Sequence, residues 1–188
     1  YGVGVDYLNT FFAFNELTGL WETLPSMPHA CMFASSGVIG DQLYVVGGFS
    51  FADDTEGGPT NILQIYDIPT RTWRLGARHP AEPGGIQPGA NLRTLVVDGK
   101  LFLLDRDSLA LGIYDPQSDT WSEEAVPFNG IVEHVCAHKG RIVVFLRNSM
   151  AFERGADGAW SRFNAGARYI DWPAANGRRA VSGSVFLG

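Results

Sequence analysis

One short segment recurs along the chain and constrains its fold more than any other feature. Each copy contains an aromatic residue, an acidic or amide residue, a turn and a tryptophan. The copies occupy residues 14–21, 66–73, 114–121 and 152–160, so their tryptophans lie 52, 48 and 39 residues apart. A repeat with such a period indicates that one structural unit is used several times.

The turn within each copy predicts a β-hairpin. Asp67 and Asp115 each begin a turn that contains a proline. Aspartate favours turns through hydrogen bonds to nearby backbone, and proline favours them through its fixed φ. Residues before the turn alternate between apolar and polar, as in 63–66. We therefore expect a hairpin whose second strand starts at the tryptophan.

A second repeated segment precedes each turn, at residues 38–48, 96–106 and 137–147. It contains a strand, a tight turn with glycine and a continuous apolar run, which is typical of a strand buried on both faces. Together the two segments predict four strands per unit, over 29–76, 91–124 and 131–163. We expect residues 7–27 to supply the last two strands of a preceding unit, and 178–188 the first two of a following one.

Four short antiparallel strands at a period of about 40–50 residues are the blade pattern of a β-propeller. We therefore predict an all-β chain, one domain over 1–188, with about four blades' worth of strands. Two arrangements remain open. The chain could close as a four-bladed ring by pairing 7–27 with 178–188, or it could be part of a larger propeller, which we prefer.

Several of these residues resemble the kelch repeat. They are the double glycine at 47–48, the Tyr66-Asp67 turn, the spaced Trp73 and the Leu-Pro-x-Met-Pro segment at 24–28. The resemblance covers nearly the whole chain and is strongest over 12–73. It implies a kelch-type propeller, and it supports the larger ring because this family usually closes with more than four blades.

Composition excludes some functions. The net charge is −6, whereas a nucleic-acid binder is usually basic. No apolar run approaches the roughly 20 residues of a membrane helix, so a membrane-spanning protein is not expected. Cys31 and Cys136 make no metal-binding spacing with the four histidines, and we expect buried free thiols, a cytoplasmic or nuclear location, and no metal or cofactor.

The repeat tryptophans and the double glycine have structural explanations. A large aromatic side chain fills the wedge between neighbouring twisted sheets, so we expect the tryptophans to pack between blades. Gly47 and Gly48 should serve an unusual backbone turn, since no helix or phosphate-binding motif follows them.

Two stretches break the repeat, at residues 49–60 and 164–177, and residues 77–90 are rich in proline and glycine. Up-and-down strand order places all three at one end of the propeller, and long loops on a rigid scaffold often carry binding sites. Simple loop drift is the alternative. The residues expected to bind a partner are Phe49, Phe51, Asp53, Asp54, His79, Arg106, Arg147, Arg168, Tyr169 and Trp172.

Arg106 and Arg147 align with Gly48, and we expect both to converge with Arg168 on that loop-bearing end. Clustered arginines favour carboxylate or phosphate groups, so the expected partner segment is acidic or phosphorylated. The alternative is that each arginine pairs with a local acid such as Asp105 or Asp107.

The resemblance implies two functions. Kelch-like proteins often bind partner proteins, as substrate adaptors of ubiquitin ligases or as scaffolds, and this is the function we expect. Some kelch-like propellers are instead enzymes that act on sugars or other small molecules, such as oxidases and epimerases. Arg93 and His134, at equivalent first-strand positions, are the sequence feature that would fit an enzyme. Fold alone does not decide between the two.

Overall fold

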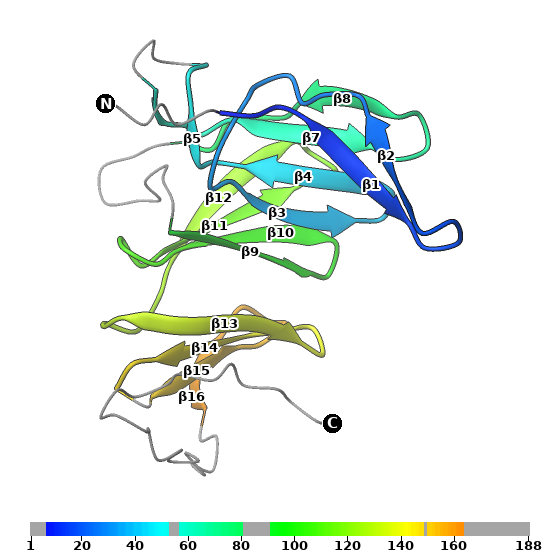
Figure 1. The fold of residues 1–188 in the computed structure, drawn as a ribbon. Coiled ribbons are helices and arrows are strands. Elements are labelled where there is room, and N and C mark those ends of the chain that lie inside the picture. The colour runs from blue at the N-terminus through cyan, green and yellow to red at the C-terminus, as the bar shows by residue number, and fades with distance from the viewer. Residues whose placement is uncertain (1–6, 53–56, 81–90, 149, 164–188) are drawn as a thin grey trace, which may run out of the picture.

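The computed structural model describes residues 7–52, 57–80, 91–148 and 150–163, and within them every regular element is a β-strand. Three four-stranded antiparallel sheets stack as successive propeller blades, with a two-stranded hairpin beside the first (Figure 1). The expected part-blade at 178–188 lies outside the described residues. Among the described residues there is no helix long and apolar enough to cross a membrane.

The N-terminal hairpin consists of β1 (Phe11–Asn15) and β2 (Leu20–Leu24). The first blade contains, in spatial order, β3 (Ser35–Ile39), β4 (Gln42–Val46), β7 (Leu63–Asp67) and β8 (Thr72–Leu75). Between β4 and β7 the chain forms a small separate sheet of β5 (Phe49–Ser50) and β6 (Gly58–Pro59).

The second and third blades repeat this order without the extra sheet. The second contains β9 (Leu92–Val97), β10 (Lys100–Asp105), β11 (Ala110–Asp115) and β12 (Thr120–Ala125). The third contains β13 (Val132–His138), β14 (Arg141–Leu146), β15 (Ala151–Arg154) and β16 (Trp160–Phe163). The all-β, propeller-type fold expected from the repeat is confirmed.

The repeated turns form by the mechanism that the sequence suggests. Asp67 Oδ1 accepts the backbone N–H of Thr70 at 2.9 Å, and Asp115 Oδ1 accepts that of Gln117 at 2.9 Å. The last turn residue has positive φ, 57° at Arg71 and 52° at Asp119. In these two blades the returning strand begins one residue before the tryptophan.

The core lies between blades, and β10 shows how. Leu101 and Leu103 belong to a buried cluster shared with the first blade, whereas Phe102 and Leu104 belong to one shared with the third. Because alternate strand residues point to opposite faces, one strand contributes to two cores. The continuous apolar run of the sequence is therefore a strand buried on both faces.

The double glycine turns the chain from β4 into β5. Gly47 and Gly48 have φ of +70° and +82°, a region that side chains other than glycine rarely adopt. A Cβ on Gly48 would lie 2.4 Å from the carbonyl oxygen of Met32, so only glycine fits this close approach. The structural explanation of the pair is confirmed.

Three of the four repeat tryptophans join one blade to the unit before it. The indole N–H of Trp73 donates to Pro25 O at 2.8 Å, that of Trp121 to Ala77 O at 2.8 Å, and that of Trp160 to Glu124 Oε1 at 2.6 Å. Trp21 differs, because 70% of its surface is exposed. The expected inter-blade packing is therefore wrong for Trp21, which has no preceding blade among the described residues to pack against.

Candidate functional site

The ends of the blades that carry the long connections form one face of the molecule. Strands β3, β9 and β13 start on this face, while β4, β10 and β14 end there. It also carries β5 and β6 and lies at the left of Figure 1. We call it the loop face.

A polar cleft opens on the loop face between the second and third blades. It has a volume of about 190 Å³ and is lined by Arg93, Arg106, Glu133, His134 and Val135. We call it the arginine cleft. Arg93 and His134, which the sequence places at equivalent positions in two first strands, therefore meet in one site.

A β-bulge shapes the wall of this cleft. Between Val132 and His134 the register of β13 against β14 shifts, which leaves Glu133 as the extra residue. The guanidinium of Arg106 bridges from the second blade to the Val132 carbonyl, with Nε 2.9 Å from the oxygen and Nη2 also donating. Arg106 thus holds the two blades together at the cleft.

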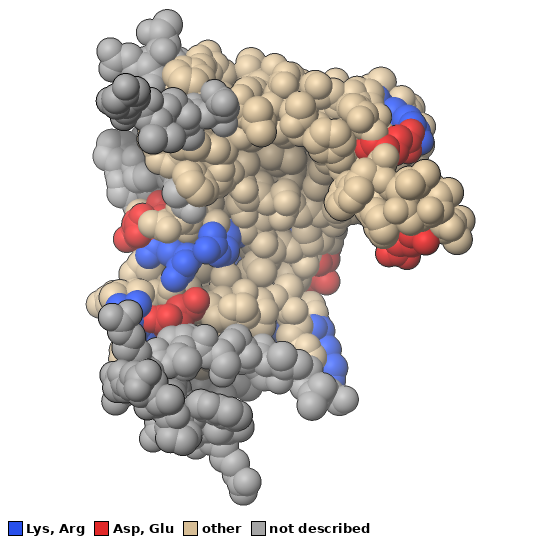
Figure 2. Space-filling model, viewed as in Figure 1, with Lys and Arg blue, Asp and Glu red and all other residues tan. Residues whose placement is uncertain are grey.

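The cleft has an excess of positive charge. Arg147, which follows β14, forms an ion pair with Glu133. Among the described residues, the guanidiniums of Arg93 and Arg106 hydrogen-bond to the backbone carbonyls of Leu92 and Val132 and form no ion pair. Figure 2 shows lysine or arginine and acidic side chains gathered together on this side of a mostly uncharged surface. Two arginine charges therefore remain without a carboxylate.

Two of the three arginines expected to converge lie close together at this cleft. Arg106 lines the cleft and Arg147 reaches its wall through Glu133, so both lie on the loop face. Asp107 accepts a hydrogen bond from Asn91, and Asp105 accepts one from Ser108. The third expected member, Arg168, lies outside the described residues, as do Asp53, Asp54, Tyr169 and Trp172.

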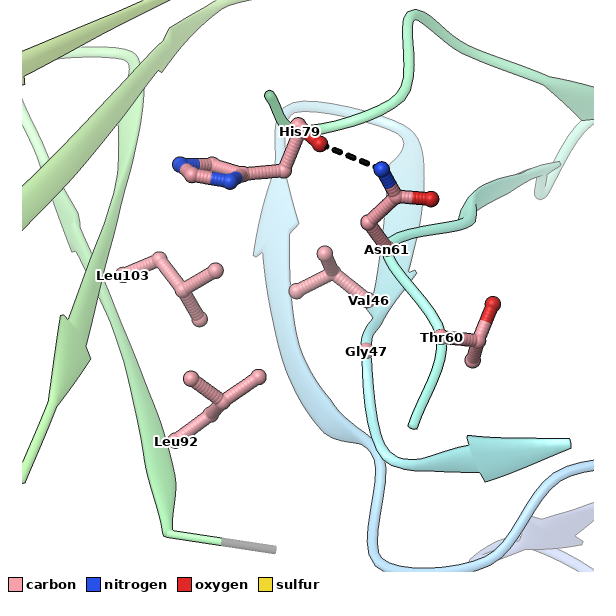
Figure 3. A pocket seen from close by; sticks show the side chains of 7 residues that line it. All are labelled: Val46, Gly47, Thr60, Asn61, His79, Leu92 and Leu103. Carbon is pink, nitrogen blue, oxygen red and sulfur yellow. Dashed lines mark hydrogen bonds between the residues drawn. The ribbon is translucent and has the colours of Figure 1, made fainter. Parts of the chain in front are cut away.

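The structure corrects the expectation that His79 binds a partner, because its side chain does not reach the surface. Its side chain is 2% exposed and lies edge-on to Trp121, with ring centroids 4.7 Å apart. Asn61 makes two hydrogen bonds to the backbone of His79. The Asn61 carbonyl accepts from the His79 backbone N–H, and the Asn61 side-chain amide donates to the His79 carbonyl (Figure 3). The loop after β8 therefore folds His79 inward between the first two blades, where apolar side chains surround it.

Burial also determines the charge of His79. Desolvation lowers the pKa of the imidazole to about 4, so the side chain is neutral at physiological pH. Nε2 lies 3.3 Å from Glu123 Oε1, but without the alignment of a hydrogen bond. The small apolar cavity beside it leaves no room for a substrate, and His79 acts as a packing residue.

The two predicted phenylalanines lie on the loop face. Phe49 is partly buried in β5 and packs against Phe33, with ring centroids 6.5 Å apart. Phe51 is 48% exposed and contacts Tyr7, with centroids 4.3 Å apart. Sequence reasoning missed Phe33, and no signal could have found it, because its position depends on a backbone conformation that is rare for phenylalanine.

Side chains that could bind a metal ion are not clustered in the described part of the chain. No group of three or more His, Cys, Asp or Glu residues there could hold a metal ion. Burial raises the pKa of both thiols, Cys31 and Cys136, which keeps them protonated and weakly nucleophilic. The arginine cleft can bind and orient an anion, and that is the chemistry its geometry supports.

Comparisons with known proteins agree with this architecture. A family profile described as the kelch motif matches residues 30–80. An F-box/kelch-repeat protein of Arabidopsis thaliana is 32% identical over 82 residues, covering 44% of this chain and 21% of that protein. The Kelch-like protein terF of Aspergillus terreus is 29% identical over 121 residues, covering 56% of this chain and 25% of that protein.

Two further comparisons extend over more of the chain. Kelch-like protein 38 of Rattus norvegicus is 21% identical over 181 residues, covering 72% of this chain and 30% of that protein. A solved structure of YjhT has a TM-score of 0.61 at 16% identity, covering 85% of this chain and 66% of that one, which shows a shared fold. The chain spans less than a third of each of the three curated relatives. The four-stranded blades, the matched kelch motif and these relatives together support a kelch-repeat family for this chain.

Proposed function

We propose that this chain is a protein-interaction module that binds a partner segment on its loop face, with the arginine cleft receiving a carboxylate or phosphate of that segment. The observation that carries the proposal is the convergence of Arg93 and Arg106 on one cleft, where both lack an acidic partner among the described residues. In a chain of net charge −6, this local positive charge has the sign that attracts an anionic ligand.

Arg93 and Arg106 each have guanidinium N–H donors that their hydrogen bonds within the described part of the chain do not use. A guanidinium carries five N–H groups in a fixed fork that matches the two oxygens of a carboxylate or phosphate. Arg93 uses Nη1 for the carbonyl of Leu92, and Arg106 uses Nε and Nη2 for that of Val132. The remaining donors can form charge-assisted hydrogen bonds, which are about twice as strong as neutral ones.

The names of the relatives suggest a cellular setting for such binding. They include F-box/kelch-repeat and kelch-like proteins. We propose that the loop face selects a partner for a larger assembly, as a substrate adaptor of a ubiquitin ligase or a scaffold, in the cytoplasm or nucleus. Binding through a rigid scaffold with long surface loops is consistent with that role.

The test replaces the arginines and measures binding to peptides. Short peptides carrying glutamate, phosphoserine or neither are titrated against the wild type and against Arg93→Ala and Arg106→Ala. We expect each substitution to weaken binding of the anionic peptides by about tenfold and to reduce its salt dependence, because a charge-assisted contact is lost. Arg71→Ala is the matched control. This exposed arginine lies in the turn between β7 and β8, at the opposite end of the blades, and forms an ion pair with Glu22. Equal binding of anionic and neutral peptides by the wild type would overturn the proposal.

A second candidate function rests on the meeting of Arg93 and His134 in the same cleft. An arginine that holds an anionic substrate beside a histidine that exchanges a proton would suit an enzyme acting on a sugar or other small molecule, of the oxidase or epimerase type. Turnover of such a substrate by the wild type, lost in His134→Ala, would favour this function over partner binding.

A further inference from the structure

Four aromatic side chains lie on the loop face as two contacting pairs. Phe33 packs against Phe49, Phe51 follows two residues along the chain, and Phe51 packs against Tyr7. Phe33 and Phe51 are 66% and 48% exposed, although phenylalanine gains most when it is buried. We call this set the aromatic row. Exposed aromatic side chains that lie close together in the chain are typical of a surface that another molecule covers.

Phe33 is also held in an unfavourable backbone conformation. Its φ is 57°, in the left-handed region that is a true outlier for a bulky residue. In the part of the chain that the structure describes, five other residues besides glycine have positive φ. Arg71, Asp98, Asp119 and Lys139 lie in the turns of hairpins, and Leu109 packs against a buried cluster.

Phe33 has neither explanation, because it lies in no hairpin turn and its side chain faces solvent. The conformation is imposed by the strand beside it. Met32 and Phe49 exchange two backbone hydrogen bonds, of 3.0 and 2.9 Å, and Gly48 packs against the backbone of residues 32 and 34. The fold therefore keeps a costly conformation whose visible result is an exposed ring. Strain of this kind is often found at ligand-binding sites.

The aromatic row and the arginine cleft begin on neighbouring strands. The backbone N–H of Thr94 donates to Ser35 Oγ at 2.9 Å, which joins β9 to β3. Phe33 lies two residues before Ser35, and Arg93 lies one residue before Thr94. Since an extended residue spans about 3.3 Å, a partner segment of a few residues can reach both sites.

We infer that the exposed rings of Phe33 and Phe51 receive a large apolar side chain of the same partner segment whose anionic group enters the arginine cleft. The inference rests on the proposed function and adds to it the composition of the partner: a carboxylate or phosphate within a few residues of a leucine or aromatic side chain. The charge of the cleft selects the anion, and the rings add apolar contact area close to it. Aromatic anchors near a fixed charge contact are common centres of binding energy.

The test separates the apolar requirement from the acidic one. Three sets of short peptides are used: one carries glutamate and leucine at varied spacing, one replaces leucine by alanine, and one replaces glutamate by glutamine. We expect the wild type to bind the first set about tenfold more tightly than the second at the best spacing. In Phe33→Gly this preference for leucine should disappear, whereas the preference for glutamate should remain.

The same variant distinguishes lost binding from lost folding. Glycine accepts positive φ without strain, so Phe33→Gly should raise Tm by a few degrees while it weakens binding. Phe33→Asn is the second variant, since asparagine tolerates this conformation and also removes the ring. Leu17→Ala is the matched control, because Leu17 is 98% exposed in the hairpin turn at the opposite end of β1.

The outcomes point to different conclusions. If Phe33→Gly and Phe33→Asn keep the preference for leucine, the inference is wrong while the proposed function stands. If the wild type shows no preference for glutamate, the proposed function itself fails. If the wild type dimerises and Phe33→Gly is monomeric, a second copy covers the aromatic row, and the inference is overturned.

Discussion

The hydroxyl of Tyr114 donates a 2.5 Å hydrogen bond to Asp119 Oδ1, whereas the equivalent hydroxyl in the preceding blade has no partner within the described part of the chain. Asp119 also accepts the backbone N–H of Ala77 at 2.8 Å, and these two bonds lower the pKa of its carboxyl. In the first blade Tyr66 occupies the place of Tyr114, but Arg71 stands where the aspartate would be. The Tyr66 hydroxyl is buried without a hydrogen bond among the described residues.

Tyr114→Phe and Tyr66→Phe should therefore differ in their effect on stability. Tyr114→Phe removes a hydrogen bond to a charged group, so we expect a loss of about 1.5–3 kcal/mol in the free energy of unfolding. Tyr66→Phe removes a buried hydroxyl that has no partner, so its effect should be neutral or stabilising. Urea denaturation of the two variants checks this. Equal losses of unfolding free energy in the two variants would show that the hydrogen bond from Tyr114 to Asp119 does not stabilise the fold.

The inter-blade tryptophans predict a second contrast. Trp121 packs against the core cluster of the first two blades and donates to Ala77 O, so Trp121→Ala should cost about 3–5 kcal/mol. Trp21 occupies the same repeat position but is largely exposed, so Trp21→Ala should cost less than about 1 kcal/mol. The measurement is the denaturant midpoint of each variant. A large loss at Trp21 would mean that this ring is covered in solution.

His79 predicts a pH dependence of stability. Burial lowers the pKa of His79 to about 4 in the folded state, whereas the unfolded value is about 6.5. Between these values the unfolded chain binds more protons, so stability is full above about pH 6.5 and falls as the pH drops toward 4. The loss is of the order of 2–3 kcal/mol. It should largely disappear in His79→Gln.

His134→Gln is the matched control for this measurement, because His134 is an exposed histidine in the third blade. Unfolding free energies are measured at several values between pH 7.5 and 4.5. Wild type and His79→Gln with the same pH slope would show that His79 is not the group responsible.

Two glutamates predict different contributions from ion pairs. Glu124 joins the second blade to the third, because it accepts hydrogen bonds from Arg154, at 2.8 Å, and from the indole of Trp160. Burial alone would raise its pKa, but these bonds more than offset that effect and hold the pKa below its usual value. Glu124→Gln should therefore cost about 1.5–3 kcal/mol at neutral pH.

Glu133 is the matched comparison, since its partner Arg147 is 65% exposed. Exposed ion pairs contribute about 0–1 kcal/mol, so Glu133→Gln should change the free energy of unfolding by no more than that. Thermal unfolding at neutral pH compares the two variants. A larger loss at Glu133 than at Glu124 would contradict the ranking by burial.

Local patterns in the sequence determined the blades. The turn that begins at Asp67 and the apolar run of β10 depend on neighbouring residues and on the alternation of side chains along a strand. The four-stranded unit could therefore be predicted from them. The inward or outward position of Trp21 could not, because that depends on whether another blade lies beside it.

Only the tertiary structure decided the site. His79 and Arg106 are both polar residues near long loops, yet one is buried against Trp121 and the other lines a cleft, because the fold of each connection differs. The register shift at Glu133 occurs where β13 pairs with β14, and the positive φ of Phe33 accompanies the backbone pairing of Met32 with Phe49. The sequence by itself determined which strands form and pair, since those interactions are periodic and local. The tertiary structure alone decided which charges and rings share a surface, because that depends on how the blades pack together.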